Sequence, residues 1–318
     1  MKKHFLFFAM AVAAMTSCMK DEVVASYEPA PQAIGFESFV NKTTKSVTAT
    51  DSGIQKFYAY AYYSTTSVTT VFDGVTVTNG VNGWDHNGAK KYWTANIYYF
   101  GAYANGNNAD PIDNVQFADG ELTIPSYTVT DANDLVADVL TVDNTALSNQ
   151  PVGFTFDHLL TKIMFTVQNT SEYTMKISSA LTINGAKKTG TCTVDNDGAT
   201  WNLQAGDITY TPIAASSAEI SVGETVPSEE MLVLPQSLAN ITYSITAEFY
   251  DANGAMVIQK SLTDRTIDPT TIENWAPGTS YNYIIGMPYA ATEITFAQPT
   301  VNGWTPYGSN IQLNPDQQ

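Results

Sequence analysis

Short runs in which apolar and polar residues alternate recur along the chain, separated by Gly, Asn, Asp and Pro. Examples are "KFYAYAYYST" (56–65), "YWTANIYYFGAYA" (92–104) and "LTKIMFTVQN" (160–169). A period of two is typical of β-strands, because successive side chains point to opposite faces of a sheet. The sequence contains no long amphipathic helix pattern. Many short strands with such turns predict an all-β protein built from β-sandwiches or barrels.

The strongest hairpin signal lies in "ITYSITAEFYDANGAMVIQKSL" (241–262), where two alternating runs meet at Asn253-Gly254. This pair is favoured where both turn residues need positive φ. In 160–169, Ile163, Phe165 and Val167 share one face, while Lys162 and Met164 share the other. Strands are therefore expected in both of these stretches.

Length and composition limit the number of domains and the kinds of partner that the chain can bind. A chain of 318 residues predicts about two domains. The polar stretch "ALSNQPVG" (146–153) predicts their joint, which gives one domain at 34–150 and another at 151–318. With 44% hydrophobic residues, two cores can be filled. A formal net charge of −17 argues against nucleic acid as a partner, because every phosphate would repel the chain.

The N-terminus has the layout of a secretory signal. Lys2 and Lys3 precede eleven uncharged residues, 5–15, and small residues then lead to Cys18. A cysteine in this place resembles a bacterial lipobox, with Met15 where leucine is usual. We predict a signal peptide at 1–17, a lipid (palmitate) on Cys18 and a tether at 18–33. The alternative is a plain leader, cut near Ala14, that leaves Cys18 free.

Few residues could carry catalysis or hold a metal. Apart from His4 in the leader, the histidines are His86 and His158, and no HExxH, CxxC or GxSxG motif occurs. The stretch "DNDG" (195–198) lacks the spacing of a calcium loop and predicts a turn between strands. With Cys18 modified, Cys192 has no disulfide partner and is expected to be a small buried strand residue. We predict no enzymatic activity, no cofactor and no metal site.

Five stretches, in this order, resemble the fimbrillin family of Bacteroidetes pilin lipoproteins. They are "NDLVAD" (133–138), "FTFDHLLTKIMFTVQN" (154–169), "MLVLPQ" (231–236), "NWAPGTSYNYIIGM" (274–287) and "EITFAQPTVNGW" (293–304). The resemblance implies two transthyretin-like β-sandwich domains in tandem and strand exchange between subunits. It also implies a fimbrium on the outside of the outer membrane, with other pilin subunits as partners and adhesion to host or bacterial surface ligands.

The resemblance assigns roles to particular segments. Lys20, Asp21 and Glu22 resemble the signal that sends lipoproteins of this phylum to the cell surface. Maturation in the family cuts after a basic residue, and the candidates are Lys45 and Lys42; the chain has one arginine, Arg265. A lysine-tolerant protease would make a shaft subunit, whereas a retained first strand and lipid would suit an anchor or accessory subunit.

The candidate donor strand is 292–313, in which Ile294, Phe296, Val301, Ile311 and Leu313 are apolar. The alternative for 292–304 is that it simply closes its own domain. For the protein as a whole, the alternative is a surface lipoprotein that binds glycans or other ligands through the same β-sandwiches.

Overall fold

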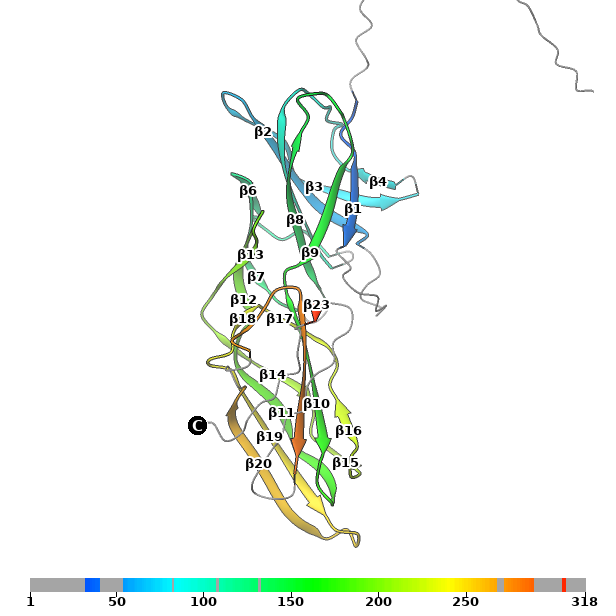
Figure 1. Cartoon of the computed structure of the whole chain (residues 1–318), viewed down its shortest axis with the longest axis vertical. Helices are drawn as coiled ribbons and strands as arrows, with labels where there is room; N and C mark the ends of the chain where they lie inside the picture. Colours follow the sequence, from blue (N-terminus) through cyan, green and yellow to red (C-terminus); the bar gives the residue numbers. More distant parts are fainter. Residues whose placement is uncertain are drawn as a thin grey trace, which may run out of the picture. The chain divides into compact units, whose positions relative to one another are not determined.

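The computed structural model describes residues 32–40, 54–81, 83–106, 109–130, 133–267, 272–288 and 305–306 (Figure 1). Regular structure in these ranges consists of strands, so the all-β prediction is confirmed. No helix able to cross a membrane occurs in the described part of the chain.

The first sheet has seven strands and is formed mostly by the first half of the chain. In spatial order it contains β1 (Phe36–Val40), β9 (Val152–His158), β8 (Leu135–Asp143), β5 (Ile97–Asn105), β2 (Lys56–Ser64), β3 (Val68–Gly80) and β4 (Gly83–His86). β1 and β9 run parallel, and the other neighbours run antiparallel. The aromatic rings of Phe36 in β1 and His86 in β4 lie 6.1 Å apart, so the two edges of the sheet approach each other across its core.

The central strands β2 and β5 of this sheet are buried on both faces, which explains why they carry so few charges. One core holds Phe57, Ala59 and Ala61 of β2 together with aromatic residues of β5 and β9. Tyr58 and Tyr60 of the same strand enter a second core on the opposite face. The alternation predicted for 56–65 is therefore confirmed, with tyrosines rather than polar residues on the outer face.

A four-stranded sheet covers that outer face. It contains β13 (Gly198–Leu203), β12 (Thr189–Asp195), β7 (Glu121–Thr128) and β6 (Gln116–Ala118). Ile124 and Cys192 of this sheet share a core with Tyr58 and Tyr103 of the first. Cys192 is a fully buried free thiol whose pKa is raised to about 12 by burial, so the prediction for this residue is confirmed.

The sheets do not divide the chain at residue 150. β9 begins at Val152, after the predicted joint, yet it pairs with β8 and β1. β12 in turn pairs with β7 across the two halves. The polar stretch at 146–151 is the connection between neighbouring strands of one sheet, since turn residues mark hairpin loops as well as linkers. A division into two sandwich domains stays a prediction.

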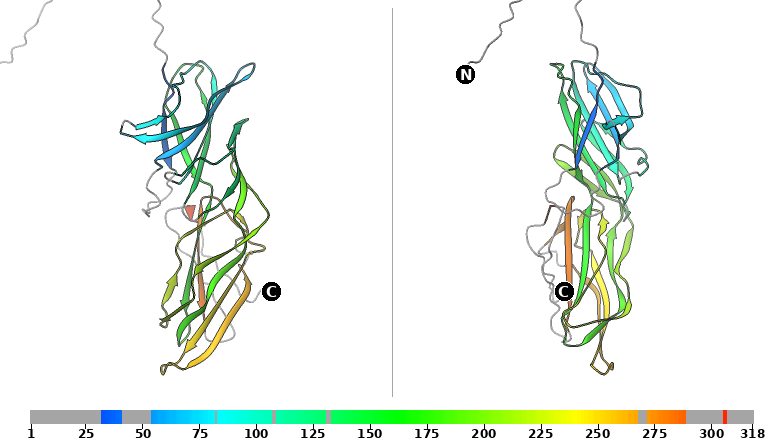
Figure 2. Two further views of the ribbon diagram at one scale, coloured as in Figure 1. Left: turned by 180° about the vertical axis from the view of Figure 1, so that it is seen from behind. Right: turned by 90° about the vertical axis from the view of Figure 1, so that its right-hand side faces the viewer.

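Two further sheets face each other in the second half of the chain. The first contains β16 (Thr225–Pro227), β17 (Met231–Val233), β10 (Thr161–Asn169), β22 (Thr279–Met287) and β23 (Thr305–Pro306). The second contains β14 (Asp207–Ile213), β15 (Ser216–Ile220), β11 (Thr174–Lys187), β19 (Thr242–Tyr250) and β20 (Met256–Thr266). Figure 2 shows β22 beside β10, with which it pairs in parallel. A short ladder joins β18 (Gln236–Ser237) to β21 (Asn274–Trp275).

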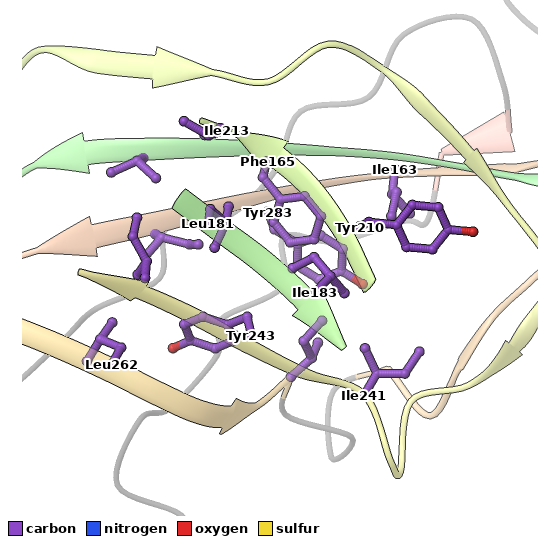
Figure 3. Close-up of a cluster of buried hydrophobic side chains, with 14 of the residues drawn as sticks. Ile163, Phe165, Leu181, Ile183, Tyr210, Ile213, Ile241, Tyr243, Leu262 and Tyr283 are labelled. Atoms are coloured by element: carbon purple, nitrogen blue, oxygen red, sulfur yellow. The ribbon is translucent and has the colours of Figure 1, made fainter. Parts of the chain in front are cut away.

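The core between these sheets follows the predicted alternation. Ile163, Phe165 and Val167 are at most 1% exposed and belong to the same core as Tyr243 and Leu262 of the facing sheet. Figure 3 shows Ile163 and Phe165 in this core together with Tyr243 and Leu262. Lys162, predicted to lie on the outer face, is also buried, with its ammonium group 3.1 Å from a carboxylate oxygen of Glu230. This ion pair allows a charged residue to leave water.

Two predicted turns form, with one change of geometry. The "DNDG" stretch closes β12 on β13 through the pair Asp195 and Gly198. β19 and β20 form the predicted hairpin, but Gly254 has positive φ and Asn253 does not. The Asp251 carboxylate accepts hydrogen bonds from the backbone N–H groups of Asn253 and Ala255, both at 2.9 Å. This cap favours a longer loop over the two-residue turn.

Candidate assembly surfaces

β1 forms an edge of the first sheet and is attached to the fold mainly by one neighbour. It pairs in parallel with β9 from Phe36↔Val152 to Val40↔Phe156. Just before it, the Ile34 N–H donates to the carbonyl of Lys91 at 2.8 Å. β1 comes before all other strands of the sheet in the sequence. It could therefore separate from β9 without breaking the pairing between any other two strands.

Two apolar side chains anchor this edge strand in the core. Ile34 and Phe36 are 3% and 5% exposed. The Phe36 ring lies 5.3 Å from the ring of Phe72 and 6.0–6.1 Å from those of Phe57 and Phe154. Removal of β1 would therefore open an apolar cavity as well as expose the backbone edge of β9.

Asp138 lies at the point where the pairing between β8 and β9 ends. These strands pair at Val136↔His158 and Ala137↔Asp157, and beyond this the Asp138 carboxylate accepts the backbone N–H of Thr155 at 2.7 Å. Burial, followed by the nearby charge of Asp157, raises the pKa of Asp138 to about 6, against the opposing effect of the hydrogen bond. The protonated carboxyl is therefore favoured by the fold.

We expect stability to fall as the pH rises from 4 to 7 because of Asp138. Its folded-state pKa, about 6, exceeds the reference value of 3.8, so its contribution is complete below 3.8 and is lost as pH rises through 6. Allowing for partial exposure, the loss is about 1 kcal/mol. The difference in free energy of unfolding between pH 4 and pH 7, measured by urea unfolding, should be smaller for Asp138→Asn than for the unmodified protein, because the variant keeps an acceptor for Thr155 but has no titrating carboxyl. Equal differences in both proteins would contradict this.

The second candidate edge is β22. Its inner side chains Tyr281, Tyr283, Ile285 and Met287 are at most 2% exposed and belong to the core. On the side away from β10, the described residues that pair with it are Thr305 and Pro306, in parallel with Thr279 and Ser280. Thr305 and Pro306, which follow β22 in the sequence, thus lie beside the residues where β22 begins.

The third edge is β20, at the border of the facing sheet. Its first residues Met256, Val257 and Ile258 are 58%, 40% and 39% exposed. An edge strand with exposed apolar residues can pair with another chain. Lys260 and Asp264 farther along the strand are charged, as is common on protected edges.

Most of the site residues predicted from the sequence lie outside the described residues. These are the lipidation site, the export signal, the cleavage candidates and the apolar donor residues: Cys18, Lys20, Asp21, Glu22, Lys42, Lys45, Ile294, Phe296, Val301, Ile311 and Leu313. Of the predicted donor stretch, the structure describes Thr305 and Pro306, which pair with a strand of their own chain.

Neither candidate histidine lies in a catalytic arrangement with a nucleophile among the described residues. The His86 ring packs 5.2 Å from the ring of Phe72, and its Nδ1 accepts the backbone N–H of Gly88 at 3.2 Å. His158 Nδ1 contacts the Asp134 carboxylate at 2.5 Å. In the described ranges, His, Cys, Asp and Glu side chains nowhere form a group of three that could hold a metal ion.

Sequence reasoning missed β1 and Asp138. The pattern "IGFESFV" (34–40) places Ile34 and Phe36 on one side and Glu37 on the other, which would have indicated an edge strand. The motif "NDLVAD" (133–138) ends at Asp138, but its sequence does not indicate that this carboxylate is partly buried. Its environment depends on β9, which begins fourteen residues later.

The fimbrillin-like family matches residues 42–304, most of the chain. The chain therefore belongs to this family, which confirms the resemblance seen in the five motifs. Membership supports a structural rather than an enzymatic role, in fimbriae or adhesion at the cell surface together with other pilin subunits. No curated protein sequence matches the chain.

Several solved structures are similar in fold. A proposed cell adhesion protein from Bacteroides uniformis has 17% identity, covers 87% of this chain and 100% of its own, and has a TM-score of 0.45. The fimbrial anchor protein Mfa2 from Porphyromonas gingivalis has 11% identity, 90% and 99% coverage, and a TM-score of 0.39. A proposed polysaccharide-binding protein from Bacteroides thetaiotaomicron has 12% identity, 80% and 90% coverage, and a TM-score of 0.38.

Proposed function

We propose that this chain is a subunit of a cell-surface fimbria, exported as a lipoprotein and joined to other pilin subunits by strand exchange. Membership of the fimbrillin-like family supports the fimbrial role. The observation that carries the assembly step is the attachment of β1, an N-terminal edge strand that fills a core and pairs in parallel with one neighbour.

The physical basis is the edge that β1 covers. If the chain is cut after Lys45 or Lys42, β1 can separate, because it then has no covalent link to the sheet. The edge of β9 would lose its pairing partners, and the places of Ile34 and Phe36 would be empty. An edge of this kind accepts a strand from another subunit, with main-chain hydrogen bonds and alternate side chains that fill the pockets.

The donor in this proposal is the C-terminal stretch 292–313. Its apolar residues Ile294, Phe296, Val301, Ile311 and Leu313 are separated by Pro299 and Pro306 into short extended pieces. Within this stretch, Thr305 and Pro306 pair with Thr279 and Ser280 at the start of β22 of the same chain, so the donor would have to extend from there to a neighbouring subunit. Burial of four or five such side chains, at about 1.5–3 kcal/mol each, would exceed the ordering cost of one strand.

Export and anchoring rest on the N-terminus. Cys18 would carry the lipid, and Lys20, Asp21 and Glu22 would direct the protein to the outside of the outer membrane. A subunit that keeps β1 would stay attached through Cys18 and serve as an anchor or accessory subunit. A subunit cleaved after Lys45 would begin at Ser46 and join the shaft.

One experiment tests export and assembly separately. Surface fractions of the native host, grown with labelled palmitate, should show the label in this chain and a ladder of polymers on a denaturing gel without heating. Cys18→Ala should lose the label. N-terminal sequencing should find either Cys18 or Ser46 as the first residue. Label in the Cys18→Ala protein would contradict lipidation, and monomers alone without heating would contradict strand exchange.

A further inference from the structure

The loops at one end of the first sheet surround the place where the N-terminal segment joins the fold. The carbonyl of Gln32 accepts the backbone N–H of Trp93 at 3.0 Å, and Ala33 forms a β-bridge with Tyr92. The start of β1 and the connection from β8 to β9 lie at this same end of the sheet (Figure 1). The tether that precedes Gln32 therefore enters the fold beside these loops.

Three large apolar side chains are exposed at this end of the sheet. Tyr92, Ile97 and Leu147 are 43% to 52% exposed. The next residues along the chain after the first two, Trp93 and Tyr98, are buried and belong to the core. The chain thus places one aromatic ring inside the fold at each of these points and leaves an apolar side chain outside it.

Leu147 is held in a conformation that is unfavourable for leucine. Its φ is 53°, in the left-handed region where a bulky residue is an outlier. The fully buried Asn144 fixes the loop, because its Oδ1 accepts the N–H of Asn149 at 2.9 Å and its Nδ2 donates to the carbonyl of Thr94 at 2.9 Å. A strained position of this kind is expected where the side chain has a use outside its own fold.

Two basic residues adjoin the exposed tyrosine in a chain that is otherwise strongly acidic. Lys90 and Lys91 directly precede Tyr92, and both are exposed. Asp143, at the end of β8, uses its carboxylate within the fold, where it accepts the N–H and the hydroxyl of Thr145 at 2.9 and 2.6 Å. Lysine ammonium groups attract the phosphates of lipid headgroups, and tyrosine rings favour the interface between lipid and water.

The length of the tether indicates what can cover this surface. Cys18 and Gln32 are 14 residues apart in the sequence. Fully extended, these residues span at most about 50 Å, and as a flexible chain they span about 20 Å. With a lipid on Cys18, this end of the sheet would stay close to the lipid layer. A covalent link raises the local concentration, so that even a weak contact with the layer can form.

We infer that this end of the first sheet docks on the lipid layer that holds Cys18. The docking surface consists of Lys90, Lys91, Tyr92, Ile97 and Leu147, and we name it the tether-side surface. Its apolar side chains would lie among the headgroups, with the two ammonium groups against their phosphates. The inference rests on the proposed lipid on Cys18 and applies to a subunit that keeps β1.

Docking would also orient the molecule. The sheets that contain β10, β22, β19 and β20 lie at the other end of the chain's described part (Figure 1). They would then point away from the membrane, where another subunit can reach the edges of β22 and β20.

The test measures how fast a water-soluble reagent acetylates lysines of the lipidated protein on vesicles of phosphatidylcholine and phosphatidylglycerol in equal amounts. Mass spectrometry gives the ratio of the rate at Lys91 to the rate at Lys188, an exposed lysine between β11 and β12. The Cys18→Ala protein, free in solution, supplies the reference ratio. We expect the ratio on vesicles to be about two- to fivefold lower than the reference. On phosphatidylcholine alone, this protection should be about twofold weaker.

Two variants remove apolar groups from the tether-side surface. Leu147→Asn should lose most of the protection of Lys91 without loss of stability, because asparagine adopts a positive φ more readily than leucine. Ile97→Ser should have the same effect on protection. The matched control is Val222→Asn, which removes an apolar side chain with a similar exposure, 59%, from the connection between β15 and β16. It should keep the protection of the unmodified protein.

Mass spectrometry of the vesicle-bound protein reports the lipid on Cys18 separately. A protein that carries the lipid but shows the reference ratio would overturn the docking inference and leave the proposed lipidation standing. A protein without the lipid would overturn both. Protection that is equal on the two kinds of vesicle would contradict the role of Lys90 and Lys91. Protection that grows with the density of protein on the vesicles would overturn docking in favour of a contact between copies of the chain.

Discussion

Phe36→Ala is expected to lower the free energy of unfolding by about 3–5 kcal/mol. Phe36 is 5% exposed and packs against the rings of Phe57, Phe72 and Phe154. Loss of its ring would leave a cavity that strands fixed by their ladders cannot close. The same contacts hold β1 on the sheet, so the substitution should also loosen the N-terminal edge that we propose is exchanged.

Urea unfolding of the purified protein measures the change. Glu37→Ala is the matched control, because the neighbouring side chain on β1 is exposed and should change stability by less than about 0.5 kcal/mol. Limited trypsin digestion should cut the Phe36→Ala protein faster than the control after Lys42 or Lys45. A Phe36→Ala protein as stable as the Glu37→Ala protein would show that β1 contributes little to the core.

Gly185→Ala is expected to lower the free energy of unfolding by about 2–5 kcal/mol. Gly185 has φ of 82°, a conformation that alanine adopts only with strain. A Cβ there would lie 2.2 Å from the backbone carbonyl oxygen of Asn240, two residues before the central strand β19 begins at Thr242. Because the obstacle is backbone rather than a flexible side chain, β11 and the Asn240 segment would have to separate.

Two other glycines allow the loss of stability from conformational strain to be separated from the loss caused by the contact with Asn240. Gly223 has φ of 80°, and a Cβ added to it would meet nothing within 4 Å, so Gly223→Ala should show the conformational strain alone, about 1–2 kcal/mol. Gly153 has open space and no positive φ, and Gly153→Ala should be close to neutral. Thermal or urea unfolding of the three variants should rank them in this order. Equal losses for Gly185→Ala and Gly223→Ala would rule out the contact with Asn240.

Local patterns predicted individual strands well and their partners poorly. The alternation at 160–169 correctly separates Ile163, Phe165 and Val167 from Met164, because a period of two is a property of the strand itself. In the motif at 274–287, Gly278 has φ of 64° directly before β22, a conformation that a glycine adopts without strain. The polar stretch at 146–153, by contrast, looks the same whether it links two domains or two neighbouring strands.

The sequence by itself determined the all-β class, the principal strands, the burial of Cys192 and the family, because these depend on short-range periodicity and on motifs in a fixed order. Only the tertiary structure decided that β9 lies between β1 and β8 and that β12 pairs with β7. Such pairings join residues tens of positions apart, and alternation within one strand carries no information about its neighbour. The same holds for Asn169, a fully buried amide whose Nδ2 donates to the carbonyls of Tyr173 and Ile220 at 2.7 and 2.9 Å. Its polarity alone predicts exposure, and the folded backbone supplies the acceptors that make its burial possible.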